Sequence, residues 1–354
     1  MTTYILRRLL LVPVLLFGVS VIIFLMLQFL SPADRASLYV RELPRNPNAV
    51  QAVIRRYGLD QPIYIQYWRW LVGQKDPYTG NIVGGLLRGE LGYSRVFSQP
   101  VVEIIQQRFP ATLELALWSV LPIIFIGVWL GIQAAIHHNG FFDQVARIFS
   151  IIGYSFPSFV FGLLVLMLLY AKLGWFPPGR VSDWVVAEIS SRQFQLVTNL
   201  ITVDALLRGR FDIFLDALRH LFLPVITLSY ISWAQFVRVT RSSMLESMHQ
   251  DYMITSRANG ASKKYAIHTH ALPNALIPVA TISGFTMIAL LGGAVITETI
   301  STFPGIGSAA ARAASNLDVV TVLGFALFSG FILIMANLAT DVIYAVLDPR
   351  VRLC

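Results

Sequence analysis

The sequence predicts an all-α membrane protein with six transmembrane helices. Of its 354 residues, 56% are hydrophobic and only 13% are charged, whereas soluble proteins are about 45–50% apolar and about 25% charged. Six apolar runs approach or exceed the roughly 20 residues that cross the hydrocarbon core of a bilayer. One orientation of these runs also gathers basic residues on one side, as the positive-inside rule expects. The chain therefore has too little polar surface to fold as a globule in water.

The first predicted span is Leu9–Leu30, interrupted only by Pro13, Ser20 and Gln28. It is longer than a signal-peptide core and no small-residue cleavage site follows, so we expect an uncleaved helix. Pro157 and Pro224 are expected to kink the third and fourth spans. The other five spans are Thr112–Ile136, Ile148–Tyr170, Leu221–Val239, Ala275–Thr297 and Val319–Val346.

Six spans place both termini on one side of the membrane. With the N-terminus inside, the inner segments carry more Lys and Arg than Asp and Glu, which predicts an N-in, C-in orientation. Residues 1–30 then form the N-terminus and first transmembrane helix, and 31–111 an extracytoplasmic helical segment. Residues 112–354 form a five-helix transmembrane core with an outer loop at 171–220 and an inner loop at 240–273.

The outer segments are predicted to contain short helices. In Pro47–Tyr57 the apolar residues recur at helical spacing, with Asn46 placed to cap the start and Gly58 to end the helix. Pro62–Leu71 repeats this pattern, and a further helix is expected around Ile213–Leu221. The stretch 75–85 has no such pattern, and its role is left open.

Motifs of enzyme chemistry are missing from the sequence. There is no GxxxxGK[ST] phosphate loop, no HExxH and no GxSxG. His268 and His270 are two residues apart, so they do not share a helix face as two metal ligands would. The net charge of +8 comes from scattered Lys and Arg residues, which favours anionic lipid over nucleic acid as its partner.

The inner loop Gln250–Pro273 has the order helix, glycine, helix, proline. Asp251 is placed to open the first helix and Gly260 to end it in the left-handed conformation. Ser262 is placed to cap the second helix, and Pro273 is expected to end it. Two short helices at the membrane surface make a docking knob for another protein.

This loop resembles that of the permease subunits of bacterial ABC importers, which carry a Glu-Ala-Ala…Gly…Leu-Pro motif there. Gly260 and Leu272-Pro273 match its end, while Ile254, Thr255 and Ser256 replace its Glu-Ala-Ala. The branch of this family that imports dipeptides, oligopeptides or nickel has a variant close to ARAxG after an acidic-Tyr pair. The matching residues are Asp251-Tyr252 and Ser256-Arg257-Ala258-Asn259-Gly260.

The resemblance extends along nearly the whole chain. The order of its motifs along a six-span chain is more specific than any single one. They are Tyr57-Gly58-Leu59-Asp60-Gln61-Pro62, Gly89-Glu90-Leu91-Gly92-Tyr93-Ser94, Arg108-Phe109-Pro110-Ala111-Thr112-Leu113-Glu114-Leu115, Asp216-Ala217-Leu218-Arg219-His220-Leu221, Phe303-Pro304-Gly305-Ile306-Gly307 and Leu347-Asp348-Pro349-Arg350-Val351-Arg352.

The resemblance implies a multi-pass permease of the bacterial inner membrane that is not itself an enzyme. Its partners are a second permease, two ATP-binding subunits, an extracytoplasmic binding protein and a di- or oligopeptide. The chain itself needs no cofactor, because ATP and Mg belong to the partner subunits. The inner loop becomes a coupling loop docked on an ATPase subunit through Asp251, Tyr252, Arg257, Ala258, Asn259, Gly260, Ala261, Lys263, Leu272 and Pro273.

The translocation path is less visible in the sequence. Glu114 and Glu298 are candidates, because charged groups at membrane depth usually face a cavity or the bundle interior. Capping a helix or pairing with arginines is an equal alternative for both. Nickel, glutathione or oligosaccharide cargo stays open, since the binding protein sets specificity. A channel or an intramembrane enzyme is disfavoured by the absence of a filter sequence and of paired acids within the spans.

Overall fold

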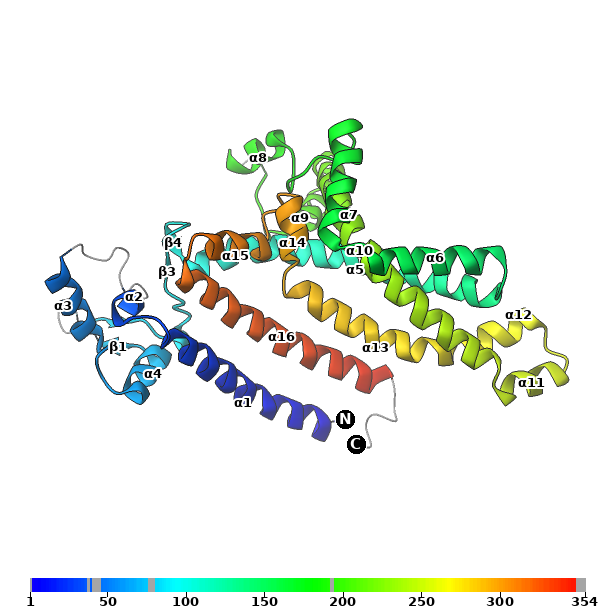
Figure 1. The fold of residues 1–354 in the computed structure, drawn as a ribbon, viewed down its shortest axis with the longest axis horizontal. Helices are drawn as coiled ribbons and strands as arrows, with labels where there is room; N and C mark the ends of the chain where they lie inside the picture. The colour runs from blue at the N-terminus through cyan, green and yellow to red at the C-terminus, as the bar shows by residue number, and fades with distance from the viewer. Residues whose placement is uncertain (1, 37–38, 40–45, 76–79, 192–193, 348–354) are drawn as a thin grey trace. The chain divides into compact units, whose positions relative to one another are not determined.

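The computed structural model describes residues 2–36, 39, 46–75, 80–191 and 194–347 (Figure 1). Within them the chain is almost wholly helical. It forms two compact units, Met1–Phe109 with Gly305–Cys354, and Pro110–Pro304. The last long helix therefore belongs with the N-terminal unit, although the sequence grouped it with the core. The C-terminal motif at 348–352 lies outside the described residues.

The first unit is built on two long helices that run antiparallel, side by side (Figure 1). Ile23, Phe24 and Leu27 of the first meet Leu323 of the second in an apolar cluster. Its helices are α1 (Thr2–Leu27), α2 (Pro32–Ala36), α3 (Pro47–Tyr57), α4 (Ile63–Val72), the 3₁₀ turn η1 (Leu86–Arg88), α15 (Ile306–Ser315) and α16 (Val319–Leu347). Helix α5 (Val101–Ile136) begins here and continues into the second unit.

Helix α3 confirms the helix predicted at Pro47–Tyr57 together with both of its ends. The side chain of Asn46 accepts a hydrogen bond from the Asn48 amide at 2.9 Å, which satisfies one of the free N–H groups of the first turn. Gly58 follows the helix with φ +63°, a left-handed conformation that favours glycine. Helix α4 lies within a residue of its predicted bounds.

Two small β-hairpins were not expected in a wholly helical chain. Strand β1 (Gln74–Lys75) pairs antiparallel with β2 (Ile82–Val83), and β3 (Tyr93–Ser94) pairs with β4 (Gln99–Pro100). The first hairpin spans the stretch around 75–85 that the sequence left unassigned, and 76–79 lie outside the described residues. Strands of two residues are too short to give an alternating pattern, so sequence periodicity missed them.

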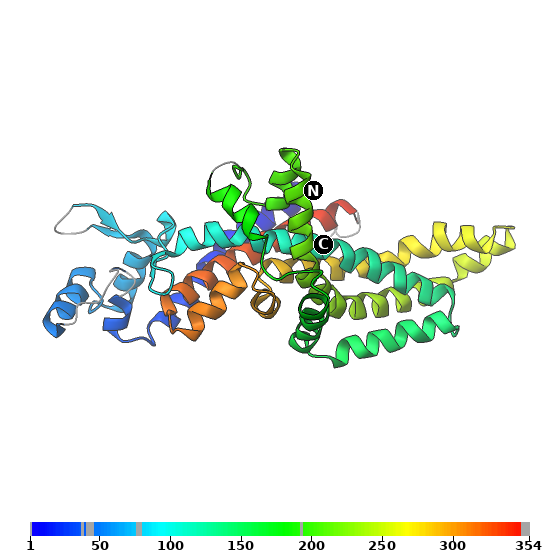
Figure 2. The same ribbon diagram turned by 90° about the horizontal axis from the view of Figure 1, so that it is seen from above.

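The second unit packs a set of helices around the longest one, α10 (Phe211–Met248), with α6, α9 and α13 against it (Figure 2). The others are α6 (Phe141–Ser155), α7 (Ser158–Val165), the π-helix η2 (Leu166–Lys172), α8 (Asp183–Ser190), α9 (Ile201–Leu207), α11 (Asp251–Ala258), α12 (Lys263–Ala266), the π-helix η3 (Ile267–Ala271), α13 (Leu272–Leu291) and α14 (Val295–Ile300). The helix expected around Ile213–Leu221 is the first part of α10.

The third predicted span, Ile148–Tyr170, is not a straight helix. α6 ends at Ser155, and the helices on either side of the break are bent by 105°. Phe156 has φ −86° and ψ 122°, because the ring of the following Pro157 disfavours helical geometry at the residue before it. A kink within one helix was expected here. The structure instead has two separate helices with a sharp bend between them. At Pro224, in contrast, α10 continues without a break.

The fifth predicted span ends early. α13 stops at Leu291, and Gly293 follows with φ +95°, a value that ends a helix at little cost only in glycine. Thr297 and Glu298 therefore lie in the separate short helix α14. Apolar composition continued through this break, so the sequence alone did not reveal it.

Four helical stretches among the described residues are long and apolar enough to cross a membrane, or five if the bent pair is one span. They are Arg8–Leu27, Val101–Ile136, Lys263–Leu291 and Val319–Thr340, with Phe141–Ser155 plus Ser158–Lys172 as the bent pair. The predicted fourth span, Leu221–Val239, lies within α10 and is not among them.

Candidate functional site

The helices α11 and α12 form a knob, residues 251–266, at the joint between α10 and α13 (Figures 1 and 2). Gly260 ends the first helix with φ +85°, and the Ser262 hydroxyl accepts a hydrogen bond from the Tyr265 amide at 3.2 Å. Both are the roles that the sequence predicted. The helix–glycine–helix pattern is therefore confirmed.

The far end of the knob differs from expectation. The sequence predicted that the second helix ends at Pro273. In the structure the helical chain continues past this residue, from α12 through the π-helix η3 into α13. Proline clashes with the carbonyl four residues earlier in a regular α-helix. The wider π turn and the placement of Pro273 at the start of α13 let the backbone pass this position. The knob is thereby joined directly to a long helix.

An apolar cluster holds the knob in place. Met253 of α11 and Ala266 of α12 are buried against Met244 of α10 and Ala135 of α5. Leu272, which was predicted to contact a partner, also packs against this cluster. Ala275 of α13 belongs to the same cluster, so three long helices converge on the buried side of the knob.

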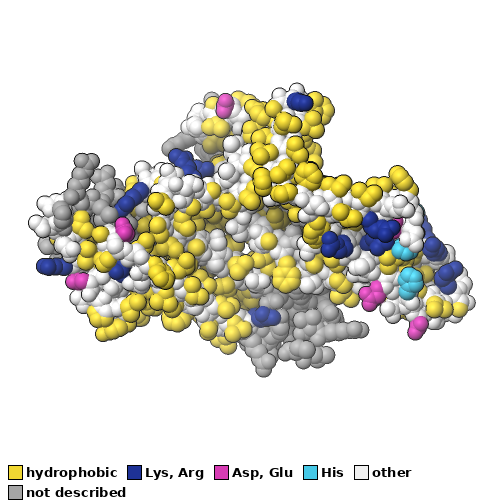
Figure 3. Space-filling model, viewed as in Figure 1, with side chains coloured by type: hydrophobic (Ala, Val, Ile, Leu, Met, Phe, Trp, Pro, Cys, Tyr) yellow, Lys and Arg dark blue, Asp and Glu magenta, His cyan; other side chains and the backbone are white. Residues whose placement is uncertain are grey.

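The outward surface of the knob carries many polar side chains together with the exposed Ile254. Figure 3 shows Lys, Arg and His side chains gathered over the part of the molecule that holds α11, α12 and the adjoining end of α10. Ala261 and Leu272 of the predicted docking set are both partly buried. The other predicted docking residues are exposed, namely Asp251, Tyr252, Arg257, Ala258, Asn259, Gly260, Lys263 and Pro273.

A shallow hollow of about 450 Å³ lies on the knob. Tyr252, Asn259 and Ala261 of the predicted set line it, together with four residues outside the predicted docking set, Thr255, Ser256, Tyr265 and His270. The spacing 252, 255, 256, 259 is that of one helix face. Applying helical periodicity to the polar residues of this loop would have found two of the four.

Both carboxylate oxygens of Glu114 accept hydrogen bonds from other residues of the chain. Its side chain is 2% exposed. Arg180 Nη2 donates to one carboxylate oxygen at 2.7 Å and Nε at 3.0 Å. The Thr202 hydroxyl donates to the other oxygen at 2.8 Å. The carboxylate thus attaches the segment between η2 and α10 to helix α5.

Glu298 is buried as completely. It is 0% exposed, and the Thr112 hydroxyl donates to its carboxylate at 2.9 Å. Thr112 and Glu114 both belong to α5, so the two carboxylates lie near one part of that helix. The pairing of Glu114 with Arg180 agrees with the alternative of an arginine partner, whereas the contact of Glu298 is with a threonine hydroxyl. The place of both acids on a translocation path stays a prediction.

The sequence missed a further buried charge pair, at the other end of α5. Asp143 of α6 is 0% exposed, and its carboxylate accepts hydrogen bonds from Arg241 Nη2 and from the Asn139 amide, both at 2.9 Å. Both residues had been assigned only to the inner charge balance. A residue type alone carries no signal that a partner 98 positions away lies within reach.

Nothing in the described part of the chain forms a metal centre, since no group of three or more His, Cys, Asp or Glu side chains lies close enough to hold an ion. His137, His220 and His249 each contact the backbone carbonyl four residues earlier. One ring nitrogen of each, Nδ1, is therefore engaged by the preceding turn of its own chain.

Two family descriptions match the chain. That of the binding-protein-dependent transport system inner membrane component covers residues 82–353. The corresponding N-terminal description of these membrane components covers residues 1–116. Together they cover the residues of the knob, the buried carboxylates and the N-terminal unit.

Curated relatives are similar over nearly the full length. A probable D,D-dipeptide transport system permease protein of Escherichia coli is 39% identical over 94% of this chain and 93% of its own. A di/tripeptide transport system permease protein of Pseudomonas aeruginosa is 37% identical over 99% of both chains. An oligopeptide transport system permease protein of Bacillus subtilis is 33% identical over 99% of this chain and 100% of its own.

Proposed function

The chain belongs to the family of binding-protein-dependent transport system inner membrane components, and from this premise we propose that it is a permease subunit of an ATP-driven peptide importer. The cargo is a di- or oligopeptide delivered by an extracytoplasmic binding protein. The peptide names of its relatives support this cargo over nickel, glutathione or an oligosaccharide.

The observation that carries the proposal is the knob. Its exposed face offers polar groups and a hollow, while its buried face is joined to α5, α10 and α13. An ATPase subunit docked on the exposed face and moving with the ATP cycle displaces the knob as a rigid lever. The attached helices then move together, which alternates access to the cargo from the two sides. ATP and Mg are bound by the ATPase subunits, and this chain has no cofactor of its own.

We further propose six spans in an N-in, C-in orientation in the bacterial inner membrane. The bent pair α6–η2 is one span and the apolar middle of α10 another, beside the four single stretches. The knob then faces the cytoplasm, where ATP is available. The assembly contains a second permease and two ATP-binding subunits.

Isolation of the tagged chain from its native membrane in mild detergent tests the proposal. We expect a second permease and ATPase subunits to be recovered by mass spectrometry, with ATP hydrolysis that rises when the loaded binding protein is added. Recovery of the chain alone, without hydrolysis across several detergent strengths, contradicts the importer assignment.

A further inference from the structure

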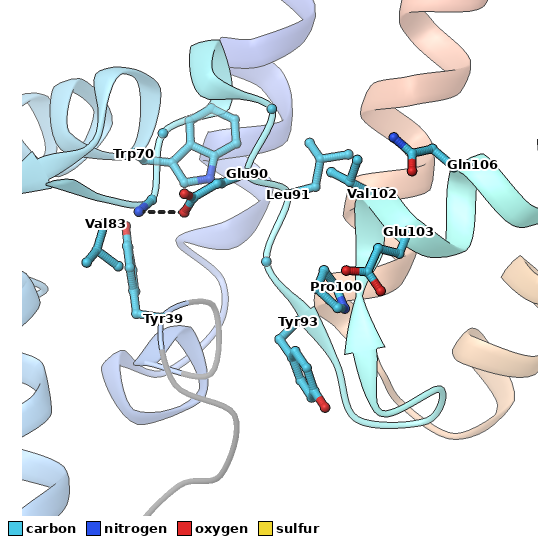
Figure 4. A pocket seen from close by; sticks show the side chains of 14 residues that line it. Tyr39, Trp70, Val83, Glu90, Leu91, Tyr93, Pro100, Val102, Glu103 and Gln106 are labelled. Atoms are coloured by element: carbon cyan, nitrogen blue, oxygen red, sulfur yellow. Dashed lines mark hydrogen bonds between the residues drawn. The ribbon is translucent and has the colours of Figure 1, made fainter. Parts of the chain in front are cut away.

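A cavity of about 590 Å³ opens in the first unit, between the hairpin β1–β2 and the start of α5 (Figure 4). It is separate from the knob and from Glu114 and Glu298, which belong to the other unit. Sites for small molecules usually measure about 300–1,000 Å³. This cavity is therefore large enough for a ligand several residues long.

Backbone geometry builds one wall of the cavity. Gly85 has φ +117°, and a Cβ placed there would come within 2.8 Å of the Val72 carbonyl oxygen, so only glycine fits. The amide of the neighbouring Gly84 donates to the Glu90 carboxylate at 2.7 Å, drawn as a dashed line in Figure 4. One oxygen of Glu90 is thus anchored while the side chain borders the cavity.

The lining is acidic and aromatic. Glu90 lies with Trp70 and Tyr39 at one side of the cavity, and Glu103 lies with Tyr93 at the other (Figure 4). Among the described residues, its lining includes two carboxylates and no Lys, Arg or His, although the chain as a whole carries a net charge of +8. Carboxylates attract cations, and the faces of aromatic rings bind them as well. Both features select the same kind of ligand.

Glu103 is available to such a ligand. Its side chain is exposed, and within the described residues it has no hydrogen-bond or ion-pair partner. It lies in the first turn of α5. Gln106, one turn further along, also lines the cavity and adds an amide that can accept a hydrogen bond.

Tyr39 contributes a neutral wall rather than a charge. Its ring stacks on Tyr57 with centroids 4.6 Å apart. Burial, opposed in part by nearby Arg69, raises the pKa of Tyr39 to about 12. The phenol therefore stays protonated at neutral pH and presents an aromatic surface.

We propose that this cavity binds the amino-terminal end of a short peptide, with the ammonium group at the exposed Glu103 and the first side chains against the aromatic rings. The inference rests on the proposed function and adds to it a cargo subsite in the first unit. The cavity is larger than a single Lys or Arg side chain of a docked protein needs, and this favours a peptide end.

Calorimetric titration of the purified importer in lipid nanodiscs, without its binding protein, tests the proposal. The probes are trialanine and N-acetyl-trialanine, which differ in the ammonium group. We expect trialanine to bind more tightly, and Glu103→Gln to weaken its binding about fivefold, as an exposed ion pair allows, while N-acetyl-trialanine is unaffected. Glu103→Asp keeps the charge and should retain the preference.

Asp60→Asn is the matched control, because Asp60 is an exposed carboxylate of the same unit that does not line the cavity. Equal binding of both peptides, or no effect of Glu103→Gln, overturns the proposal. It is also overturned if Glu103→Gln lowers only the ATP hydrolysis stimulated by the binding protein, which would assign the cavity to a basic side chain of that protein. A transport measurement separates the cavity proposal from the importer assignment, and it uses trialanine in the same preparation.

If trialanine is transported but the two peptides bind equally, the cavity proposal fails and the importer assignment stands. If trialanine is not transported, the importer assignment itself is contradicted.

Discussion

The Pro110–Pro304 unit carries two long connections between its helices, the segment 173–210 and the knob, and they differ in what their polar side chains contact. In the first, buried carboxylates bind polar groups of the segment, one carboxylate from helix α5 and one from within the segment itself. Glu114 holds Arg180 and Thr202, and Asp204 accepts hydrogen bonds from the amide and hydroxyl of Thr198 at 2.9 Å. In the knob, the polar side chains are exposed and the buried contacts are apolar.

This difference separates groups that hold the fold from groups that are free to meet a partner. A carboxylate buried with its hydrogen bonds satisfied cannot leave them without a large cost. An exposed side chain that is supported by a buried apolar cluster can exchange water for a partner at little cost in free energy. Substitutions in segment 173–210 are therefore expected to change stability, and substitutions on the knob to change association with the ATPase subunits.

Gly260→Asp gives the largest expected effect on coupling. A side chain at this position meets no other atom of the described chain within 4 Å, so it projects toward whatever docks there. Blocking a central contact of about 2 kcal/mol or more lowers ATPase association roughly 30-fold. We expect peptide transport to be lost while membrane insertion, assayed by protease protection, is retained.

The matched control for this variant is Gly209→Asp in segment 173–210. Gly209 also has a left-handed φ, +66°, and open space around its Cβ, so it shares the backbone strain without the docking surface. Transport that is normal in the Gly260 variant, or equally impaired in both, is the result that contradicts a docking role for the knob.

Glu114→Ala should give the largest loss of stability. It leaves Arg180, whose side chain is 13% exposed, buried without its charged partner, and breaking a buried pair costs about 3–5 kcal/mol. The midpoint of thermal unfolding in detergent measures the change. Asp251→Ala on the knob is the control, and it should stay within about 0.5 kcal/mol because that side chain is exposed. Similar losses at both positions contradict the contrast between the two regions.

The first unit also contains a buried, hydrogen-bonded carboxylate, that of Asp318, and its effect on stability should depend on pH. Burial alone would raise its pKa, but hydrogen bonds from Ser94, Thr321 and the Val96 amide hold the pKa below its usual range. Such a group stabilises the fold above the unfolded pKa of about 3.9, and this contribution is lost as pH falls through the folded value. The unfolding midpoint should therefore drop more steeply on acidification in wild type than in Asp318→Asn. Parallel pH profiles would show that the carboxylate has no such role.

Arg257→Ala is expected to have the smallest effect. Arg257 is exposed on α11, and an exposed ion pair with a partner contributes about 0.2–1 kcal/mol. We expect ATPase association to weaken less than about fivefold and the difference to shrink in high salt. Arg88→Ala, an exposed arginine of η1 in the first unit, should leave association unchanged. An effect of Arg257→Ala that persists at high salt argues for a shaped contact rather than a charge.

Local sequence signals were sufficient for several elements. The cap at Asn46, the stop at Gly58 and the Gly260–Ser262 turn of the knob each depend on residues within a few positions of one another. Such signals act through backbone conformation and neighbouring hydrogen bonds, which are present in any fold that contains the element.

Interruptions of the spans were harder to predict. Pro157 predicted a kink, but the size of the bend, 105°, depends on what the two helices pack against. Apolar composition continues through Gly293, so it hides the break between α13 and α14. Hydropathy reports the solvent of a segment and not whether its helix is continuous.

The sequence by itself determined the membrane as solvent, the family and the local geometry of the knob, because composition, motif order and capping are properties of short stretches of chain. Only the tertiary structure decided which charged side chains bond within the chain and which stay open to a ligand. Glu114 and Arg180 are 66 residues apart, and Glu90 and Glu103 reach one cavity by way of a hairpin that left no periodic signal. A carboxylate has the same letter whether it is buried in a hydrogen-bond network or open to a ligand, and its role follows from the partners that folding brings near.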